Sequence, residues 1–173
     1  NPAIGASIYY DLPGDKPAET LALSFWTSGG ELIRRFSLAD DQSKQPAEMR
    51  LRAEPGLHRF VWNMRHPDAT RIEGAALSLY WGGSTIGPVV APGTYVARLE
   101  VGDKEYRQAF AVERDPRVDA TDEDLVAQCQ LLLQIRDKLG AVHDAVLASR
   151  RLREQITAWS ARLDNAGNEN LVS

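Results

Sequence analysis

The stretch EPGLHRFVWNMRHP, residues 54–67, is the part of the chain that decides the fold of the first two thirds. Phe60, Trp62 and Met64 stand at alternate positions, so in a β-strand they share one face. Two large aromatic side chains in register on one strand are what the core of a β-sandwich needs. We therefore expect Trp62 to lie in a core rather than in a binding site.

Six other segments before residue 117 have the β-branched and aromatic content of strands, and turn signals separate them. They are residues 6–12, 20–27, 31–37, 75–81, 94–101 and 104–112. Gly102-Asp103 predicts a two-residue hairpin turn of type II′. About seven short antiparallel strands predict a mainly β domain over residues 1–117, with the architecture of an immunoglobulin-like or fibronectin-like β-sandwich.

Residues 118–173 change to a helical period and contain no proline, which predicts a long helix or helical hairpin over 121–164 and a polar tail over 165–173. Thr121 followed by three acidic residues is typical of a helix start. A helix of about forty residues is roughly 60 Å long, too long for one small sandwich to cover. Either the helix folds back near Ser149 or part of it pairs with another chain or segment. The expected interface stripe is Leu125, Leu132, Leu139, Val142 and Val146.

Composition limits the classes of partner. The 173 residues carry a formal net charge of −4 with a pI of about 5.4, which argues against nucleic acid and anionic membranes. No apolar run approaches the ~20 residues of a membrane span. A single cysteine, Cys129, excludes an internal disulfide and a cysteine-based zinc cluster, and we expect it to be a small buried side chain. The chain opens with Asn-Pro-Ala, and we interpret it as a piece of a longer protein.

No catalytic, cofactor-binding or metal-binding constellation emerges from the sequence. His58 and His66 lie eight positions apart with a strand between them, and His143 lies on the predicted helix. Phosphate-loop, nucleophile-elbow and zinc-protease motifs are absent from the sequence. The acidic residues gather in loops and at the helix start, where they are usually solvated or capping. We therefore predict that the chain is not an enzyme and needs no cofactor.

One long connection keeps a binding hypothesis open. Residues 77–93 carry Tyr80 and Trp81 beside several glycines, and long aromatic loops are frequent binding sites. Together with Trp26 they could form a flat platform for the sugar rings of a polysaccharide. The alternative is that these side chains cover the open end of the sandwich or pack on a neighbouring domain.

Three segments resemble one known family. PGLHRFVWNMR (55–65), GPVVAPGTYVARLEVGDKEYRQAFAVERDPR (87–117) and the helical LVAQCQLLLQIRDKLGAVHDAV (125–146) are similar to the C-terminal immunoglobulin-like domain and following segment of bacterial exported β-propeller proteins. These are the sortilin-like "glycosyl hydrolase" proteins with neuraminidase (BNR) repeats. The first two segments also resemble the immunoglobulin-like domain of flagellar hook-capping proteins.

The resemblance implies an exported protein, periplasmic or extracellular, with a propeller domain upstream of residue 1. The matched residues Phe60, Trp62, Gly93 and Tyr95 are structural, so no catalytic role carries over to this chain. The leading hypothesis is a non-catalytic accessory module that acts as a spacer, packs on the propeller, or assembles through its helix, with a homodimer as one candidate partnership. The alternatives are a carbohydrate-binding module using Tyr80 and Trp81, or an enzyme in its own right.

Overall fold

The computed structural model describes residues 5–72 and 85–169, with the side chains of the C-terminal helix described as far as residue 163. Its contacts divide the chain into two compact units. The first comprises Asn1–Pro67 and Gly87–Leu133, and the second comprises Asp68–Ile86 and Gln134–Ser173. The predicted domain boundary between residues 117 and 118 stays a prediction.

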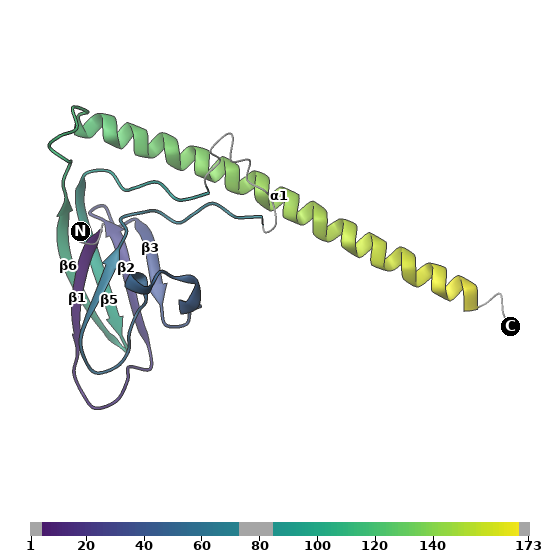
Figure 1. Cartoon of the computed structure of the whole chain (residues 1–173), viewed down its shortest axis with the longest axis horizontal. Helices are drawn as coiled ribbons and strands as arrows, with labels where there is room; N and C mark the ends of the chain where they lie inside the picture. Colours follow the sequence, from purple (N-terminus) through teal and green to yellow (C-terminus); the bar gives the residue numbers. More distant parts are fainter. Residues whose placement is uncertain (1–4, 73–84, 170–173) are drawn as a thin grey trace. The chain divides into compact units, whose positions relative to one another are not determined.

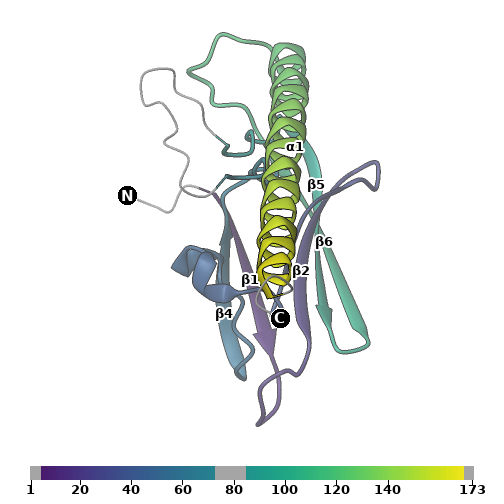
Figure 2. The same cartoon turned by 90° about the vertical axis from the view of Figure 1, so that its right-hand side faces the viewer.

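The first unit contains two antiparallel sheets (Figure 1). Its strands are β1 (Ala6–Leu12), β2 (Leu21–Thr27), β3 (Leu32–Ser37), β4 (Gly56–Trp62), β5 (Gly93–Val101) and β6 (Lys104–Val112). β1 pairs with β4, and the larger sheet has the order β3-β2-β5-β6. Figure 2 shows β1 and β4 beside each other, apart from β2, β5 and β6. Two short 3-10 helices, η1 (Gln42–Lys44) and η2 (Ala47–Met49), lie between β3 and β4.

The core consists mainly of the apolar residues that alternate along the predicted strands. Leu21, Leu23 and Phe25 of β2 are at most 2% exposed, and Phe60 and Trp62 of β4 are fully buried. The Phe25 and Trp62 rings stack with centroids 4.1 Å apart and planes at 11°, so side chains from the two sheets meet in one aromatic core. The prediction that Trp62 is a core residue is confirmed.

The predicted strand bounds agree closely with the structure. Residues 6–12 and 104–112 match β1 and β6 at both ends, and β2, β3 and β5 begin within one residue of the expected positions. The turn between β5 and β6 has Gly102 at φ 56°, and among the described residues Met64 is the one non-glycine with positive φ. Asp103 therefore has negative φ, as a type II′ turn requires. The predicted strand at 75–81 lies outside the described residues.

Three positions show features that strand alternation alone does not predict. Val61 lies outside the core cluster to which Phe60 and Trp62 belong, yet it is only 4% exposed, because η2 packs along β4. β4 ends at Trp62, and Met64 follows in the left-handed region with φ 53°. Tyr106 of β6 is 56% exposed, although it alternates with Phe110 and Val112, because a two-stranded sheet cannot cover all four strands opposite it.

The helix α1 runs without interruption over Asp122–Glu169, so the predicted alternative of a hairpin near Ser149 was wrong. After Pro116 the chain has no proline to break the backbone hydrogen bonds, and Ser149 is tolerated in a helix interior. At its start, Thr121 and Asp124 cap each other: each backbone N–H donates to the other side chain, at 3.0 and 3.1 Å. The predicted capping start is confirmed.

We expect Leu23→Ala to lower the free energy of unfolding of the first unit by about 2–5 kcal/mol, because Leu23 is fully buried between the sheets. Leu57→Ala removes the same atoms from a strand position that is 73% exposed and should change stability by less than about 0.5 kcal/mol. Urea denaturation followed by tryptophan fluorescence measures both. Equal losses for the two variants would contradict the placement of the core.

Candidate functional site

The predicted interface stripe on α1 is divided between covered and exposed positions. Leu125, Leu139 and Val146 are partly buried, whereas Leu132 is 42% exposed and Val142 is 59% exposed. In the second unit, His143 Nδ1 lies 2.5 Å from the Thr70 carbonyl oxygen on this side of the helix. His143 is therefore partly buried, whereas Val142 and Asp144 on either side of it are exposed.

From residue 148 to residue 163 every side chain of α1 is exposed. A second apolar row, which shares Val142 with the predicted stripe, is exposed along its whole length in the second unit. We name it the outer seam. Its members are Ile135, Lys138, Val142, Ala145, Ser149, Leu152, Ile156 and Trp159. The large apolar members are exposed by 54% at Ile135, 59% at Val142, 58% at Leu152, 58% at Ile156 and 64% at Trp159. The steps between members alternate between three and four residues, which is the heptad spacing of a helix-pairing surface. This spacing is present in the sequence, but Leu152 and Trp159 were not identified there.

The predicted sugar platform is described only at Trp26. The Trp26 indole N–H donates to Ser24 Oγ at 2.8 Å, and the Arg98 guanidinium lies 5.5 Å from the ring centre. Arg98 therefore occupies a place over the ring where a sugar would stack. Tyr80 and Trp81 lie outside the described residues.

A row of ion pairs crosses the outward face of the larger sheet. Arg35 Nη2 of β3 lies 2.9 Å from Glu100 Oε2 of β5, and Arg98 Nε lies 3.5 Å from Glu100 Oε1. Arg98 and Arg107 both contact the carboxylate of Glu105 on β6. The bond from Arg107 lowers the pKa of the Glu105 carboxyl, and the bond from Arg98 lowers it further. The partners neutralise one another, so this row is typical of a solvated sheet face.

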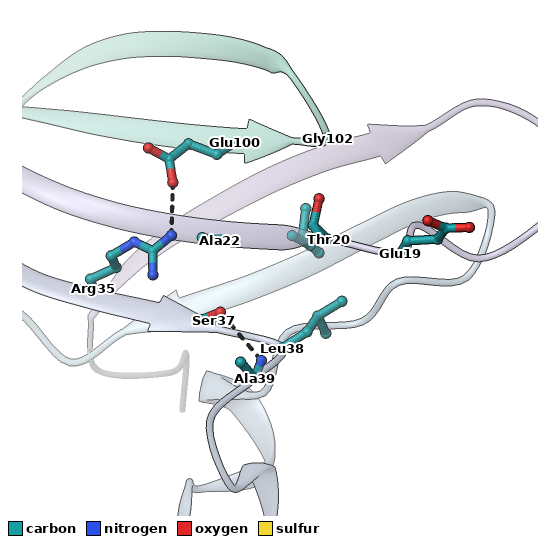
Figure 3. A pocket seen from close by; sticks show the side chains of 10 residues that line it. Glu19, Thr20, Ala22, Arg35, Ser37, Leu38, Ala39, Glu100 and Gly102 are labelled. Carbon is teal, nitrogen blue, oxygen red and sulfur yellow. Dashed lines mark hydrogen bonds and ion pairs between the residues drawn. The ribbon is translucent and has the colours of Figure 1, made fainter.

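Two of the hollows on the described part of the first unit differ in character. A polar one of about 390 Å³ contains the Arg35–Glu100 ion pair, with Glu19, Thr20 and Ser37 around it (Figure 3). Its arginine is already paired with a carboxylate, which leaves it poorly suited to hold an anion. A larger hollow of about 800 Å³ lies beside β1 and the β5–β6 turn. Leu99 and Val101 line it together with the exposed tyrosines Tyr9 and Tyr106.

The lone cysteine is buried, as predicted. Cys129 Sγ donates to the Val89 carbonyl oxygen at 3.4 Å, and it lies 4.0 Å from His66 Nε2. Burial raises the pKa of the Tyr95 phenol. The fold brings together a cysteine and a histidine that are far apart in the sequence. The buried thiol is bonded to the backbone and packs the part of α1 that belongs to the first unit, residues 122–133.

The described residues do not form a metal centre. Among residues 5–72 and 85–169, no group of three or more His, Cys, Asp or Glu side chains is arranged to hold a metal ion. The His58 ring donates instead from Nε2 to the Glu54 carbonyl oxygen at 2.6 Å. Over the same residues, no helix has the length and apolar character needed to cross a membrane.

Comparison with known proteins gives no match to a protein-family model, to a curated protein or to a solved structure.

We expect Arg107→Ala to raise the pKa of Glu105 toward its ordinary value of 4.5, because Arg107 makes the largest contribution to lowering it. The folded pKa of Glu105 is below its unfolded value, so the ion pairs stabilise the fold above the ordinary pKa, and this stabilisation is lost as the pH falls through the folded pKa. A side-chain carbon NMR titration measures the shift. Arg114→Ala is the control, since Arg114 bonds the Val118 and Ala120 carbonyls and should leave Glu105 unchanged.

Proposed function

We propose that the chain is a non-catalytic interaction module, and that its working surface is the outer seam of α1. The observation that carries the proposal is the exposure of five large apolar side chains on one heptad-spaced face, each more than half exposed. Burying these side chains against a partner would be favourable, because apolar surface would be removed from water. Many proteins recognise a partner through an apolar helical face of this kind.

Four shifted carboxyl groups of the described residues are held in caps and surface ion pairs. The pKa values of Asp41, Glu105, Asp115 and Asp124 are all lowered, and in each case a hydrogen bond from a near neighbour is the main cause. Lowered values of this origin are typical of caps and surface ion pairs. A general acid at neutral pH needs the opposite shift.

The setting of the module is also a proposal. We infer that the two sheets are an immunoglobulin-like sandwich at the C-terminal side of an exported β-propeller protein of the sortilin-like, BNR-repeat kind. Support comes from the three sequence segments that resemble that family and from the antiparallel arrangement of the sheets. In this setting the propeller holds any hydrolytic site, and the present chain serves as an assembly or packing element.

We expect the backbone amides of residues 148–163 to exchange hydrogen rapidly in the dilute isolated chain and to become protected when the partner is present, because burial of the outer seam suppresses local opening. Hydrogen-exchange mass spectrometry compares the chain at low and high concentration and within the larger exported protein. Ile156→Ser should remove the protection, whereas Ala161→Ser, on the opposite face, should retain it. Rapid exchange under every condition would contradict an interaction surface on this helix.

Carbohydrate binding is a second candidate, favoured by the larger hollow. Tyr9 and Tyr106 are 63% and 56% exposed beside an apolar floor, and Asp11, Asp103 and Lys104 supply polar groups at the same hollow. Exposed aromatic faces with nearby hydrogen-bonding groups suit the alternating apolar and polar surfaces of sugars. This hollow differs from the platform at Tyr80 and Trp81 predicted from the sequence.

We expect Tyr9→Ala and Tyr106→Ala each to abolish any retardation of the chain in gels containing soluble polysaccharides, because each removes one aromatic wall of the hollow. Leu57→Ala, an exposed apolar position outside the hollow, is the matched control. Loss of retardation in Trp81→Ala alone would place binding on the long connection instead. Free migration of the parent chain in every polysaccharide would end this candidate.

A further inference from the structure

The outer seam is complementary to itself when a second copy of the helix runs in the opposite direction. In heptad terms, Ile135, Val142, Ser149 and Ile156 are a positions, and Lys138, Ala145, Leu152 and Trp159 are d positions. Each a position is separated from residue 147 by the same number of residues as one d position on the other side of residue 147. A two-fold axis beside residue 147 therefore sets every a residue against a d residue of the other copy.

The layers produced by this symmetry are well matched in chemistry. They pair Ile135 with Trp159, Lys138 with Ile156, Val142 with Leu152, and Ala145 with Ser149, each residue opposite its counterpart on the second copy. Three of the four layers contain a large apolar side chain that is more than half exposed in the single chain. The aliphatic stem of Lys138 can pack on Ile156 while its ammonium group stays in water.

The centre of the seam is hollow. A shallow cavity of about 390 Å³ lies on α1 at Ala145 and Ser149, bordered by Val142, Val146 and Arg150. The two-fold axis falls at this hollow, so the small side chains of both copies meet there and the helices can approach closely. The large side chains then interdigitate on either side of the axis.

Charge selects the antiparallel direction over the parallel one. Residues 148–163 carry four arginines and one glutamate, whereas residues 134–147 carry two basic and two acidic residues. A parallel pair in register would set Lys138 against Lys138 and the arginine-rich halves against each other, which is destabilising. An antiparallel pair sets each arginine-rich half against the balanced half and brings Asp144 level with Arg150 and Arg151 of the other copy.

We propose that the partner of the outer seam is a second copy of this chain, joined as an antiparallel pair of α1 helices with its two-fold axis beside residue 147. This inference rests on the proposed interaction function and names its partner. The seam from Ile135 to Trp159 is about 36 Å long and roughly one helix diameter wide. The area of this strip is smaller than the ~800 Å² that each partner buries in a standard interface. We therefore expect the dimer to dissociate on dilution.

Sedimentation equilibrium of the full chain over the micromolar range tests the association. We expect the mass to rise from monomer to dimer with concentration, and Leu152→Ser with Ile156→Ser to weaken the association at least about tenfold by removing anchors from two layers. Ala161→Ser should leave it unchanged, because residue 161 lies on the opposite face of the helix. A monomeric mass at every concentration would overturn the dimer.

Disulfide trapping tests the direction of the helices in a Cys129→Ala background. Ala148→Cys should cross-link to itself under mild oxidation, because residue 148 adjoins the two-fold axis. Ile156→Cys should not, since its two copies would lie about 27 Å apart along the axis, far beyond the reach of a disulfide. Cross-linking of Ile156→Cys without Ala148→Cys would show a parallel pair and overturn the proposal.

The two proposals fail differently. A chain that stays monomeric while its residues 148–163 are protected within the larger exported protein would overturn the homodimer and leave the interaction module intact. Rapid exchange of the same residues in the larger protein and in the concentrated chain would overturn both.

Discussion

The stacking of Phe25 on Trp62 is the contact on which the first unit depends. These two rings come from different sheets, both are fully buried, and their planes lie within 11° of each other. Tyr95 and Phe110 each make an edge-to-face contact with Trp62, so β5 and β6 contact the same ring. Among the described residues the Trp62 indole N–H has no hydrogen-bond partner. The apolar contacts of the ring must therefore offset the cost of burying that N–H.

Much of this architecture can be predicted from alternation in the sequence, because a strand with one buried face shows a period of two. β1 and β6 have the predicted bounds, and the aromatic face of β4 is buried. The sequence does not predict how much of each strand face is covered by the opposite sheet. Tyr106 has the same alternation as Phe110 yet remains exposed, since coverage depends on the number of strands in the opposite sheet.

For the helix too, the local sequence predicts the element but not which of its faces other segments cover. Its sequence contains two apolar rows, and nothing local decides which row a distant segment will touch. In the second unit Thr70 reaches His143, a contact that joins residues 73 positions apart. Likewise the stacking of Arg98 over Trp26 follows from the register between β2 and β5, which single-sequence patterns do not specify. Cover separates the two rows only as far as residue 147, because every side chain from residue 148 to residue 163 is exposed, and there the heptad spacing alone defines the candidate surface.

The ion pairs of the larger sheet have a further consequence for β6, which stands at its edge. An edge strand of nine residues presents backbone donors and acceptors that could template pairing with another molecule and begin aggregation. β6 carries Lys104, Glu105 and Arg107 along its first half. An invading strand would have to disturb or desolvate these charges. The ion pairs that join β3, β5 and β6 across their outward face therefore also disfavour the addition of a strand from another molecule to the edge at β6.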